Sequence, residues 1–424
     1  MLKEMMTSVR SARRLGQTSI AMNKLALAWL RKDQQERPYL LRDTMQELGS
    51  TYIKLGQLIA SSPTIFPQEY VDAFQSCLDK TPPLPYSTIL PILEQELGVK
   101  LKTRFRSIDR EPLASASIAQ VHAAQLLNGE DVVIKVQKPG VKQLLATDFQ
   151  FLSLATQMLE MINPKAWKSS VGDIVEEIRN GMLEECNFRQ EADNIEEFDR
   201  FLQQAGIEDV VVPKVCRELS TEKVLVMERF FGVPISDIEG VARITADPEH
   251  SLVQALNTWF MSLRQCQLYH ADLHAGNVMM LNDGRIGFID FGIVGRLSPA
   301  TWEGLTSLAV CVPAEDFDGL ALALSKIGAT RDAINLEQFA SDLKRFWQNI
   351  SSDSMLDSTD PDSFWRAITM DFSTISTRHG IRFPREFTLL LKQFLYFDRY
   401  IRLLAPEVDM FDSDRMDMVG LEFH

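Results

Sequence analysis

The sequence predicts an α+β protein with two lobes, a small lobe built on an antiparallel sheet and a larger helical lobe, preceded by a helical N-terminal extension. Three observations support this prediction. Short alternating, β-branched segments are concentrated between residues 105 and 137, and apolar stripes with helical spacing dominate from residue 252 onward. A chain of 424 residues is also long enough for two or three separate hydrophobic cores.

Composition narrows the class of protein. Hydrophobic residues make up 45% of the chain and charged residues 24%, as in folded soluble proteins. The net charge of −14 argues against a nucleic-acid partner, which would require a basic face. No apolar run reaches the roughly 18 residues of a membrane span, since charges interrupt the best candidate, 387–404. The cysteines are scattered and odd in number, which indicates reduced thiols in a cytoplasmic compartment; they are Cys77, Cys186, Cys216, Cys266 and Cys311.

Residues 1–33 differ in charge from the rest of the chain. Seven Lys/Arg against the single acid Glu4 give residues 1–32 a charge of +6, so the remainder carries −20. Apolar residues at an imperfect helical spacing accompany these charges. Such a helix can lie on an anionic membrane surface, which predicts a peripheral membrane protein. A helix packed on the body of the protein and an organellar targeting peptide are the alternatives.

Residues 34–100 are expected to form the helical extension. Gln34–Ser62 has one apolar stripe and predicts a single long helix that ends before Pro63 and Pro67. On this helix, Lys54 and Gln57 of K-L-G-Q are three residues apart and project from one face. Two shorter helices are predicted after it, Tyr70–Leu78 and Ser87–Leu97.

Residues 101–228 are expected to form the sheet lobe, with strands at Phe105–Ile108, Gln120–Leu127 and Val132–Gln137. Lys135 ends V-V-I-K, the pattern of the protein-kinase strand whose lysine contacts nucleotide phosphates. The stretch between the first two strands has no glycine, so phosphate binding there would rely on Ser115 and Ser117 hydroxyls and on fewer backbone donors. The candidate nucleotide-binding loop is Ala114, Ser115, Ala116 and Ser117.

Asp173–Leu202 predicts a second long helix, which in a kinase supplies a glutamate for the strand lysine. Spacing alone does not show which glutamate of this segment would pair with the lysine. Strands are predicted at Val210–Val215 and Lys223–Met227, after which the backbone around Glu228 and Phe230 is placed to bind an adenine. The competing glutamates are Glu176, Glu177, Glu184, Glu185, Glu191, Glu196 and Glu197.

Residues 229–424 are expected to form the helical lobe, and they contain the chemistry. Helix Leu252–Gln267 leads into His270-Ala271-Asp272, and Asp272 and Asn277 have the spacing H-x-D-x-x-x-x-N. A hairpin, 278–281 and 286–289, then leads to Asp290-Phe291-Gly292. Phosphoryl transfer needs one carboxylate near the attacking oxygen and oxygen ligands for Mg²⁺. Asp272 fits the first role, and Asn277 and Asp290 fit the second.

The chain after Gly292 has no A-P-E and no long activation segment, and an arginine is missing before Asp272. A peptide substrate would have little surface on which to dock, which favours a small-molecule or lipid substrate, or simple ATP hydrolysis. The helices predicted here are Trp302–Val310, Phe317–Lys326, Leu336–Gln348, Phe364–His379 and Glu386–Leu403.

These motifs together resemble the UbiB/AarF-type atypical kinases, from about Leu48 to Leu404. The resemblance implies a protein-kinase-like fold with the extension across the cleft, binding of ATP or ADP with Mg²⁺, and a link to ubiquinone or other isoprenoid-lipid metabolism at membranes. The motifs are K-L-G-Q at 54–57, A-S-A-S-I-A-Q-V-H at 114–122, V-V-I-K at 132–135, E-C-N-F-R-Q-E-A at 185–192, H-A-D-L-H-A-G-N at 270–277 and D-F-G at 290–292.

The resemblance also assigns roles to residues of this chain. It implies that Lys135 pairs with Glu191, that Asp272 is the catalytic acid, and that Asn277 and Asp290 hold the metal. It implies further that Lys54 and Gln57 face an E-x-D element that begins at Glu185 and regulates the site. The chain departs from the family pattern at Asn187, in place of the E-x-D aspartate, and at Ala119, in place of a glycine.

The main hypothesis is therefore an ATPase or unusual kinase in a lipid pathway, with Mg-ATP between the lobes and a lipid, an anionic membrane or lipid-biosynthesis enzymes as partners. Asn187 and the glycine-free loop favour a second hypothesis, a nucleotide-sensing pseudokinase or lipid-presenting module. An antibiotic-type small-molecule phosphotransferase shares H-x-D-x-x-x-x-N and the missing activation segment, although K-L-G-Q and the alanine loop argue against it.

Overall fold

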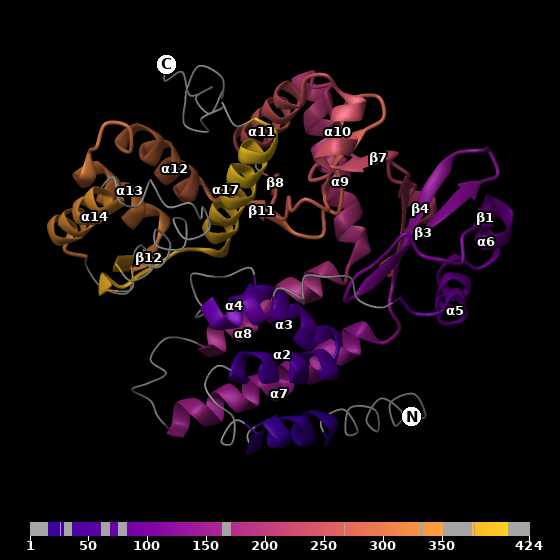
Figure 1. The fold of residues 1–424 in the computed structure, drawn as a ribbon, viewed down its shortest axis with the longest axis horizontal. Coiled ribbons are helices and arrows are strands. Elements are labelled where there is room, and N and C mark those ends of the chain that lie inside the picture. The colour runs from indigo at the N-terminus through magenta and orange to yellow at the C-terminus, as the bar shows by residue number, and fades with distance from the viewer. Residues whose placement is uncertain are drawn as a thin grey trace. The chain divides into compact units, whose positions relative to one another are not determined.

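The computed structural model describes residues 16–25, 27–28, 36–60, 68–74, 83–162, 171–266, 268–330, 334–350, 375–376 and 378–405. The fold is α+β, as the sequence predicts, and it divides into two compact units (Figure 1). The first unit comprises Met1–Ala192 and Val215–Arg229, and the second comprises Asp193–Lys214 and Phe230–His424.

The first unit contains an antiparallel sheet of order β1-β3-β4-β6, with β2 paired to β3. Figure 1 shows α5 (Tyr86–Leu97) and α6 (Val99–Arg104) beside this sheet. Alternation along β4 directs Ile134 and Val136 into a core with Ile89 and Leu93 of α5, and therefore directs Lys135 to the opposite face. The strands are β1 (Phe105–Ile108), β2 (Ala114–Ser115), β3 (Ala119–Leu126), β4 (Asp131–Gln137) and β6 (Val224–Glu228).

The prediction of one long helix over Gln34–Ser62 is wrong. The structure has two helices, α2 (Arg37–Leu48) and α3 (Ser50–Ala60), because Gly49 adopts φ 91°, a left-handed conformation that no helix interior accepts. Ile59 of α3 then packs with Ala73 and Phe74 of α4 (Gln68–Phe74). The apolar stripe continued across the break, so the periodicity did not reveal it.

The prediction of one helix over Asp173–Leu202 is also wrong. The chain forms α8 (Val171–Glu185) and α9 (Phe188–Ala205), and the Asn187 side chain accepts a hydrogen bond from the backbone N–H of Arg189 at 3.2 Å. Asn187 therefore acts as the N-cap of α9. The long helix α7 (Val141–Ile162) was not predicted.

The second unit contains a four-stranded sheet of order β5-β10-β9-β7 and the pair β8·β11. The predicted hairpin is confirmed, with β9 and β10 joined by a turn in which Gly284 has φ 89°. The strands are β5 (Val210–Val211), β7 (Gly232–Pro234), β8 (Leu268–His270), β9 (Val278–Leu281), β10 (Ile286–Phe288) and β11 (Val294–Arg296).

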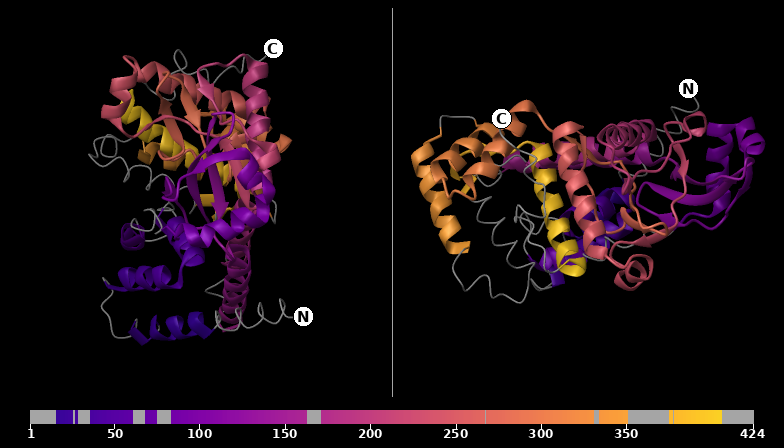
Figure 2. Two further views of the ribbon diagram at one scale, coloured as in Figure 1. Left: turned by 90° about the vertical axis from the view of Figure 1, so that its right-hand side faces the viewer. Right: turned by 90° about the horizontal axis from the view of Figure 1, so that it is seen from above.

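Most predicted helices of this unit are confirmed, whereas most of Phe364–His379 lies outside the described residues. Figure 2 shows α12–α14 grouped beside α17, where Phe387 of α17 joins the core of α13 and α14. Trp259 of α11 packs edge-on against Phe397 of α17, with ring centroids 4.7 Å apart. The helices are α10 (Ile238–Ile244), α11 (Pro248–Gln265), α12 (Pro299–Cys311), α13 (Phe317–Ile327), α14 (Leu336–Ile350) and α17 (Arg385–Leu404).

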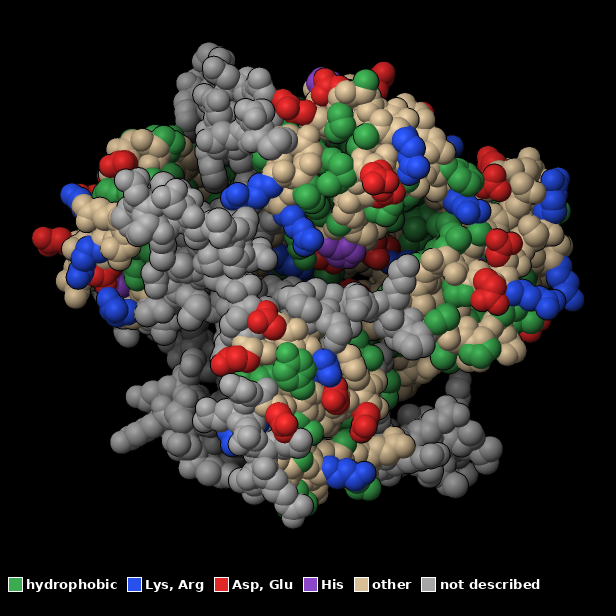
Figure 3. Space-filling model, in the orientation of Figure 1, with side chains coloured by type: hydrophobic (Ala, Val, Ile, Leu, Met, Phe, Trp, Pro, Cys, Tyr) green, Lys and Arg blue, Asp and Glu red, His purple; other side chains and the backbone are tan. Residues whose placement is uncertain are grey.

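The surface and the N-terminal segment bear on membrane contact. Basic and acidic side chains are interspersed over the described surface on the face drawn in Figure 3. Residues 16–25 are helical, and Ile20 and Leu27 are each 59% exposed, while residues 1–15, 26 and 29–33 of the basic segment lie outside the described residues. Within the described residues, no helix has the length and hydrophobicity to cross a bilayer.

Candidate active site

The structure pairs Lys135 with Glu191 in the first unit. Lys135 Nζ lies 2.7 Å from Glu191 Oε1 and 3.0 Å from Oε2, and the two side chains are only 10% and 2% exposed. Lys135 Nζ also lies 5.3 Å from the centroid of the Phe188 ring, within the range of a cation–π contact. The ammonium is therefore held by two groups of one helix, α9.

The start of α9 explains why Glu191 is the partner. Because Asn187 caps the helix, Phe188 and Glu191 are three residues apart within its first turns and share a face. Glu191 also continues the buried stripe of Ile195 and Phe198. Asn187, which stands where the family pattern has aspartate, thus has a structural role, and asparagine caps a helix as well as aspartate does.

The glycine-free loop is a tight turn. Ala114 and Ser115 form β2 against β3, and the backbone N–H of Ala116 donates to the carbonyl of Ala119 at 2.8 Å. None of these residues has a positive φ, so the turn does not require glycine. Ser117 is buried, and so is Ser115, whose Oγ has no hydrogen-bond partner within the described residues. A buried hydroxyl of this kind fits a ligand oxygen acceptor.

Gln120 and His122 of the same motif have a structural role that the sequence did not reveal. Both are fully buried. The Gln120 side chain accepts from Leu84 N–H at 3.0 Å and donates to the Leu84 carbonyl at 3.2 Å. Its Nε2 also donates to His122 Nε2 at 2.8 Å, while His122 Nδ1 donates to the Asp109 carbonyl at 2.8 Å. This network fixes the segment before α5 to the sheet.

We expect Gln120→Leu to destabilise the first unit. The substitution leaves one nitrogen of the buried His122 and both backbone groups of the half-buried Leu84 without their Gln120 partner, at a cost of about 1–3 kcal/mol. Gln125→Leu is the matched control, because Gln125 lies on the same strand and its side-chain bonds to Arg106 and Asp131 are exposed. Denaturant unfolding measures both, and equal losses would contradict the role of Gln120.

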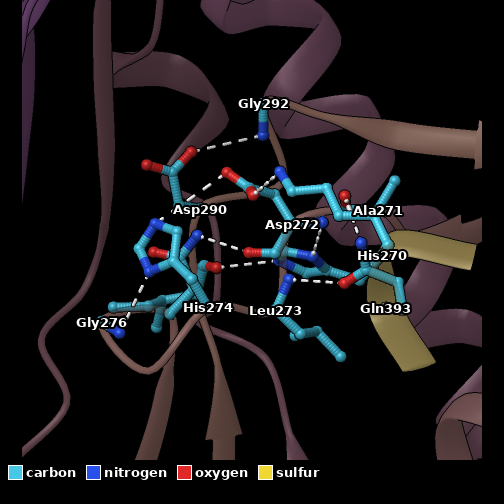
Figure 4. Close-up of polar contacts among 12 residues, drawn as sticks. His270, Ala271, Asp272, Leu273, His274, Gly276, Asp290, Gly292 and Gln393 are labelled. Atoms are coloured by element: carbon cyan, nitrogen blue, oxygen red, sulfur yellow. Dashed lines mark hydrogen bonds and ion pairs between the residues drawn. The ribbon is translucent and has the colours of Figure 1, made fainter. Parts of the chain in front are cut away.

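The loop that contains Asp272 and Asn277, residues 270–277, lies in the second unit between β8 and β9. The pairing of β8 with β11 brings His270 opposite Val294. The Ala271 N–H donates to the Ile293 carbonyl at 3.1 Å, and the Ile289 N–H donates to the Asn277 carbonyl at 3.0 Å. These bonds tie the loop of residues 270–277 to the D-F-G segment, so Asp272, Asn277 and Asp290 belong to one hydrogen-bonded framework. Figure 4 shows Asp272 and Asp290 within it.

His270 is buried, and its two ring nitrogens link the Asp272 loop to the segment before Asp290. Its Nε2 donates to the Ile289 carbonyl at 3.0 Å, and its Nδ1 accepts from the backbone N–H of Asp272 at 3.1 Å. The ring packs edge-on against Phe291, with centroids 4.6 Å apart. Burial lowers the pKa of His270, and a neutral ring is required because a proton on Nδ1 would remove the acceptor for Asp272.

Asp272 is also held through its carbonyl and its carboxylate. Its carbonyl accepts from Asn277 Nδ2 at 2.8 Å, which directs the Asn277 amide oxygen away from this bond. Its carboxylate accepts from Lys392 Nζ at 2.9 Å and lies 3.9 Å from His274 Nε2. His274 Nδ1 accepts from Gly276 N–H at 3.1 Å, so Nε2 bears the hydrogen that faces Asp272.

Helix α17 supplies residues that the sequence analysis missed. Gln393 Oε1 accepts from Leu273 N–H at 2.9 Å and its Nε2 donates to the Ala271 carbonyl at 2.7 Å. Gln393 therefore binds the backbone on both sides of Asp272 (Figure 4). Tyr400 donates to the Leu273 carbonyl at 2.7 Å. Burial lowers the pKa of Lys392, but the Asp272 charge and Tyr396 outweigh it, and the net pKa is raised.

Asp290 has an unusual backbone. Its φ is 61°, a left-handed conformation that aspartate and asparagine adopt more readily than other residues with a Cβ. Phe291 is fully buried against His270 and Phe198, and its carbonyl accepts from Asn194 Nδ2 at 3.0 Å. The buried phenylalanine anchors the segment, and the strained residue before it carries the carboxylate.

The remaining predicted residues have less definite roles. Lys54 and Gln57 belong to α3, but their side chains lie outside the described residues. Glu185 ends α8 and is half-buried, and Glu228 ends β6 and is exposed. The half-buried Phe230 ring occupies the space beside Gly287 that a Cβ would fill.

The residues of the second unit fit a hard cation. Mg²⁺ takes oxygen ligands, and Asp290 and Asn277 offer a carboxylate and an amide oxygen on two loops that are bonded to each other. Within the described part of the chain, no group of three or more His, Cys, Asp or Glu is arranged for a metal. The donor set therefore suits an ion that brings further ligands with it, such as phosphate oxygens and water.

Comparisons with known proteins show the family to which the chain belongs. The sequence model of the ABC1 atypical kinase-like domain matches residues 76–323. A chloroplastic aarF domain-containing protein kinase of Arabidopsis thaliana is 43% identical over 403 residues, which cover 90% of this chain and 75% of the relative. The probable protein kinase UbiB of Azotobacter vinelandii is 28% identical, with 91% and 72% covered.

Among solved structures, Rv3197 of Mycobacterium tuberculosis in complex with erythromycin is similar, with a TM-score of 0.53 and 25% identity over 84% of this chain and 89% of that one. The family match spans more than half of the chain, and it includes the Lys135–Glu191 pair, the Asp272 loop and Asp290. The chain belongs to the ABC1 atypical kinase-like family.

Proposed function

We propose that this protein is an atypical ATPase or kinase that binds Mg-ATP and acts in ubiquinone or other isoprenoid-lipid metabolism at a membrane surface. The observation that supports it best is the framework of Asp272, Asn277 and Asp290, three oxygen-bearing side chains on two hydrogen-bonded loops. The kinase names of the relatives support the activity, and the ubiquinone link rests on the UbiB resemblance.

In the proposed reaction, a water or a substrate hydroxyl attacks the γ-phosphorus of ATP. Its proton passes to the Asp272 carboxylate, the new P–O bond forms, and the bond to the ADP oxygen breaks. Asn277 and Asp290 would hold Mg²⁺, which offsets phosphate charge when it is bound. Lys135, held by Glu191, would contact the α- and β-phosphates, and Ser115 Oγ would donate to a phosphate oxygen.

The chain after Gly292 supports a small or lipid substrate. β11 ends at Arg296, and α12 begins at Pro299 after its N-cap Ser298, so no long segment intervenes on which a peptide could dock. The exposed Ile20 and Leu27 in the basic N-terminal segment support contact with an anionic membrane. Because one relative is chloroplastic, an organellar targeting peptide is the other explanation of the basic segment.

A second candidate is a nucleotide-sensing pseudokinase or lipid-presenting module. Asn187 favours it, because a capping amide replaces an acid of the family pattern and offers no charge for a metal or a lysine. This candidate retains nucleotide binding and predicts no phosphoryl transfer.

We expect ATP with Mg²⁺ to raise the unfolding temperature and to be hydrolysed, with faster phosphate release when anionic vesicles are present. Binding stabilises the folded state in proportion to occupancy, by about 2.7 kcal/mol at one hundred times the Kd. Thermal-shift titration and a phosphate-release assay measure the two effects. Stabilisation without release would support the pseudokinase. Release stimulated by erythromycin, which is bound in the Rv3197 complex, would indicate an antibiotic-type phosphotransferase.

A further inference from the structure

The proposed catalytic loop, residues 270–277, contains no lysine or arginine near Asp272. Between Asp272 and Asn277 are leucine, histidine, alanine and glycine, and no Lys or Arg occurs from Leu268 to Gly284. The surroundings are nevertheless rich in negative charge, because Asp272 and Asp290 are acids and the proposed nucleotide brings several more. Besides the proposed Mg²⁺, a cation from elsewhere in the chain reduces the Coulomb repulsion among these groups if it lies close to Asp272.

Lys392 of α17 is such a cation. Its Nζ lies 2.9 Å from Asp272 Oδ1 and 5.4 Å from the centroid of the Tyr396 ring. The Lys392 and Asp272 side chains are 28% and 19% exposed, so the pair is partly shielded from solvent. One oxygen of the carboxylate is thereby fixed by an ammonium, while the other faces His274 at 3.9 Å.

The position of Lys392 is set by its neighbours. Gln393 binds the backbone of Ala271 and Leu273, and Tyr400 binds Leu273 again, so α17 is docked on the loop independently of Lys392. Docking of the helix is therefore secured by neutral hydrogen bonds. The ion pair, whose side chains are 28% and 19% exposed, adds on the order of 1 kcal/mol to these bonds, so the fold of the loop does not depend on Lys392.

We propose that Lys392 is the positioning residue for Asp272, and that it supplies from α17 the positive charge which the catalytic loop lacks. This inference rests on the proposed function. Lys392 orients the Asp272 carboxylate toward the attacking hydroxyl. It also offsets the negative charge near the reacting atoms during phosphoryl transfer. Its contribution is therefore to the rate of the reaction and not to nucleotide binding.

The first test compares Lys392→Met, Lys392→Arg and Lys326→Met in steady-state ATP hydrolysis. Lys326 is the matched control, since it forms an exposed ion pair with Glu303 in the same unit. We expect Lys392→Met to lower kcat about 100-fold with KM for ATP nearly unchanged. We expect Lys392→Arg to recover most of the loss and Lys326→Met to leave kcat unchanged. An unchanged kcat in Lys392→Met, or no recovery with arginine, would overturn the proposal.

The second test does not depend on turnover. Thermal unfolding without nucleotide is measured for Lys392→Met, Asp272→Asn and the double variant. If the two groups interact, the double variant loses no more than the worse single variant, about 2–4 °C. Additive losses would overturn the pairing. If the wild type releases no phosphate, the proposed function fails, and this cycle still decides whether Lys392 positions Asp272.

Discussion

Asp290→Asn is expected to reduce Mg-ATP turnover at least about 100-fold while the protein remains folded. The side chains have the same shape, but the amide has no charge and binds Mg²⁺ far more weakly than a carboxylate. The backbone makes asparagine the appropriate substitution, because φ is 61° at this residue and asparagine tolerates the left-handed region. Phosphate release and the unfolding temperature are measured on the same preparation.

The matched control is Asp283→Asn in the turn of the hairpin. Asp283 is exposed and its carboxylate accepts from Arg285 at 2.6 Å, so the substitution removes a surface ion pair close in sequence to Asp290. We expect normal turnover and a stability change within about 0.5 kcal/mol. Unchanged turnover in Asp290→Asn would remove Asp290 from the metal site and leave the proposal without its second acid.

The grouping of Asp272, Asn277 and Asp290 could be predicted because the sequence information that specifies it is local. Asp272, Asn277 and Asp290 fall within 19 residues of sequence, and the turn at Asn282-Asp283-Gly284 specifies the hairpin that joins their loops. Chain connectivity brings these residues near one another, so motif spacing was sufficient. The alternation of V-V-I-K likewise placed Lys135 on the face opposite the core of the sheet.

Long-range partners could not be predicted in this way. Lys392 follows Asp272 by 120 residues, and in the sequence it is one of several charged residues on the predicted C-terminal helix, 386–403. Gln120 and Leu84 are similarly distant, and no local rule identifies a buried glutamine that bonds a linker. Such pairings depend on the docking of one element on another, which propensity and periodicity do not encode.

Helix breaks were the other source of error. Gly49 and Asn187 each stood inside an apolar stripe that continued on both sides, so the 3.6-residue period concealed the ends. The second break mattered for the site. Phe188 and Glu191 lie in the first turns of a helix only because α9 begins after Asn187. Without that break, spacing alone left seven glutamates as possible partners of Lys135.

The buried pair Lys135–Glu191 gives the largest expected effect on stability. Glu191→Leu removes a carboxylate that is 2% exposed and deprives the Lys135 ammonium of its hydrogen-bonded counter-charge. Breaking such a pair from one side costs about 3–5 kcal/mol, whereas replacing both members with apolar residues is often nearly neutral. We therefore expect Glu191→Leu to destabilise the first unit strongly, and Lys135→Met/Glu191→Leu to regain most of the loss in denaturant unfolding.

The surface pair Lys142–Glu222 of the same unit provides the comparison, because its side chains are 53% and 49% exposed and Glu222→Gln should cost less than about 1 kcal/mol. Equal losses in Glu222→Gln and Glu191→Leu would contradict the buried character of the pair. Turnover separates the two roles of Lys135. The double variant regains its fold but has no ammonium for the phosphates, so it should remain inactive. A stable and active double variant would show that the pair only supports the sheet and α9.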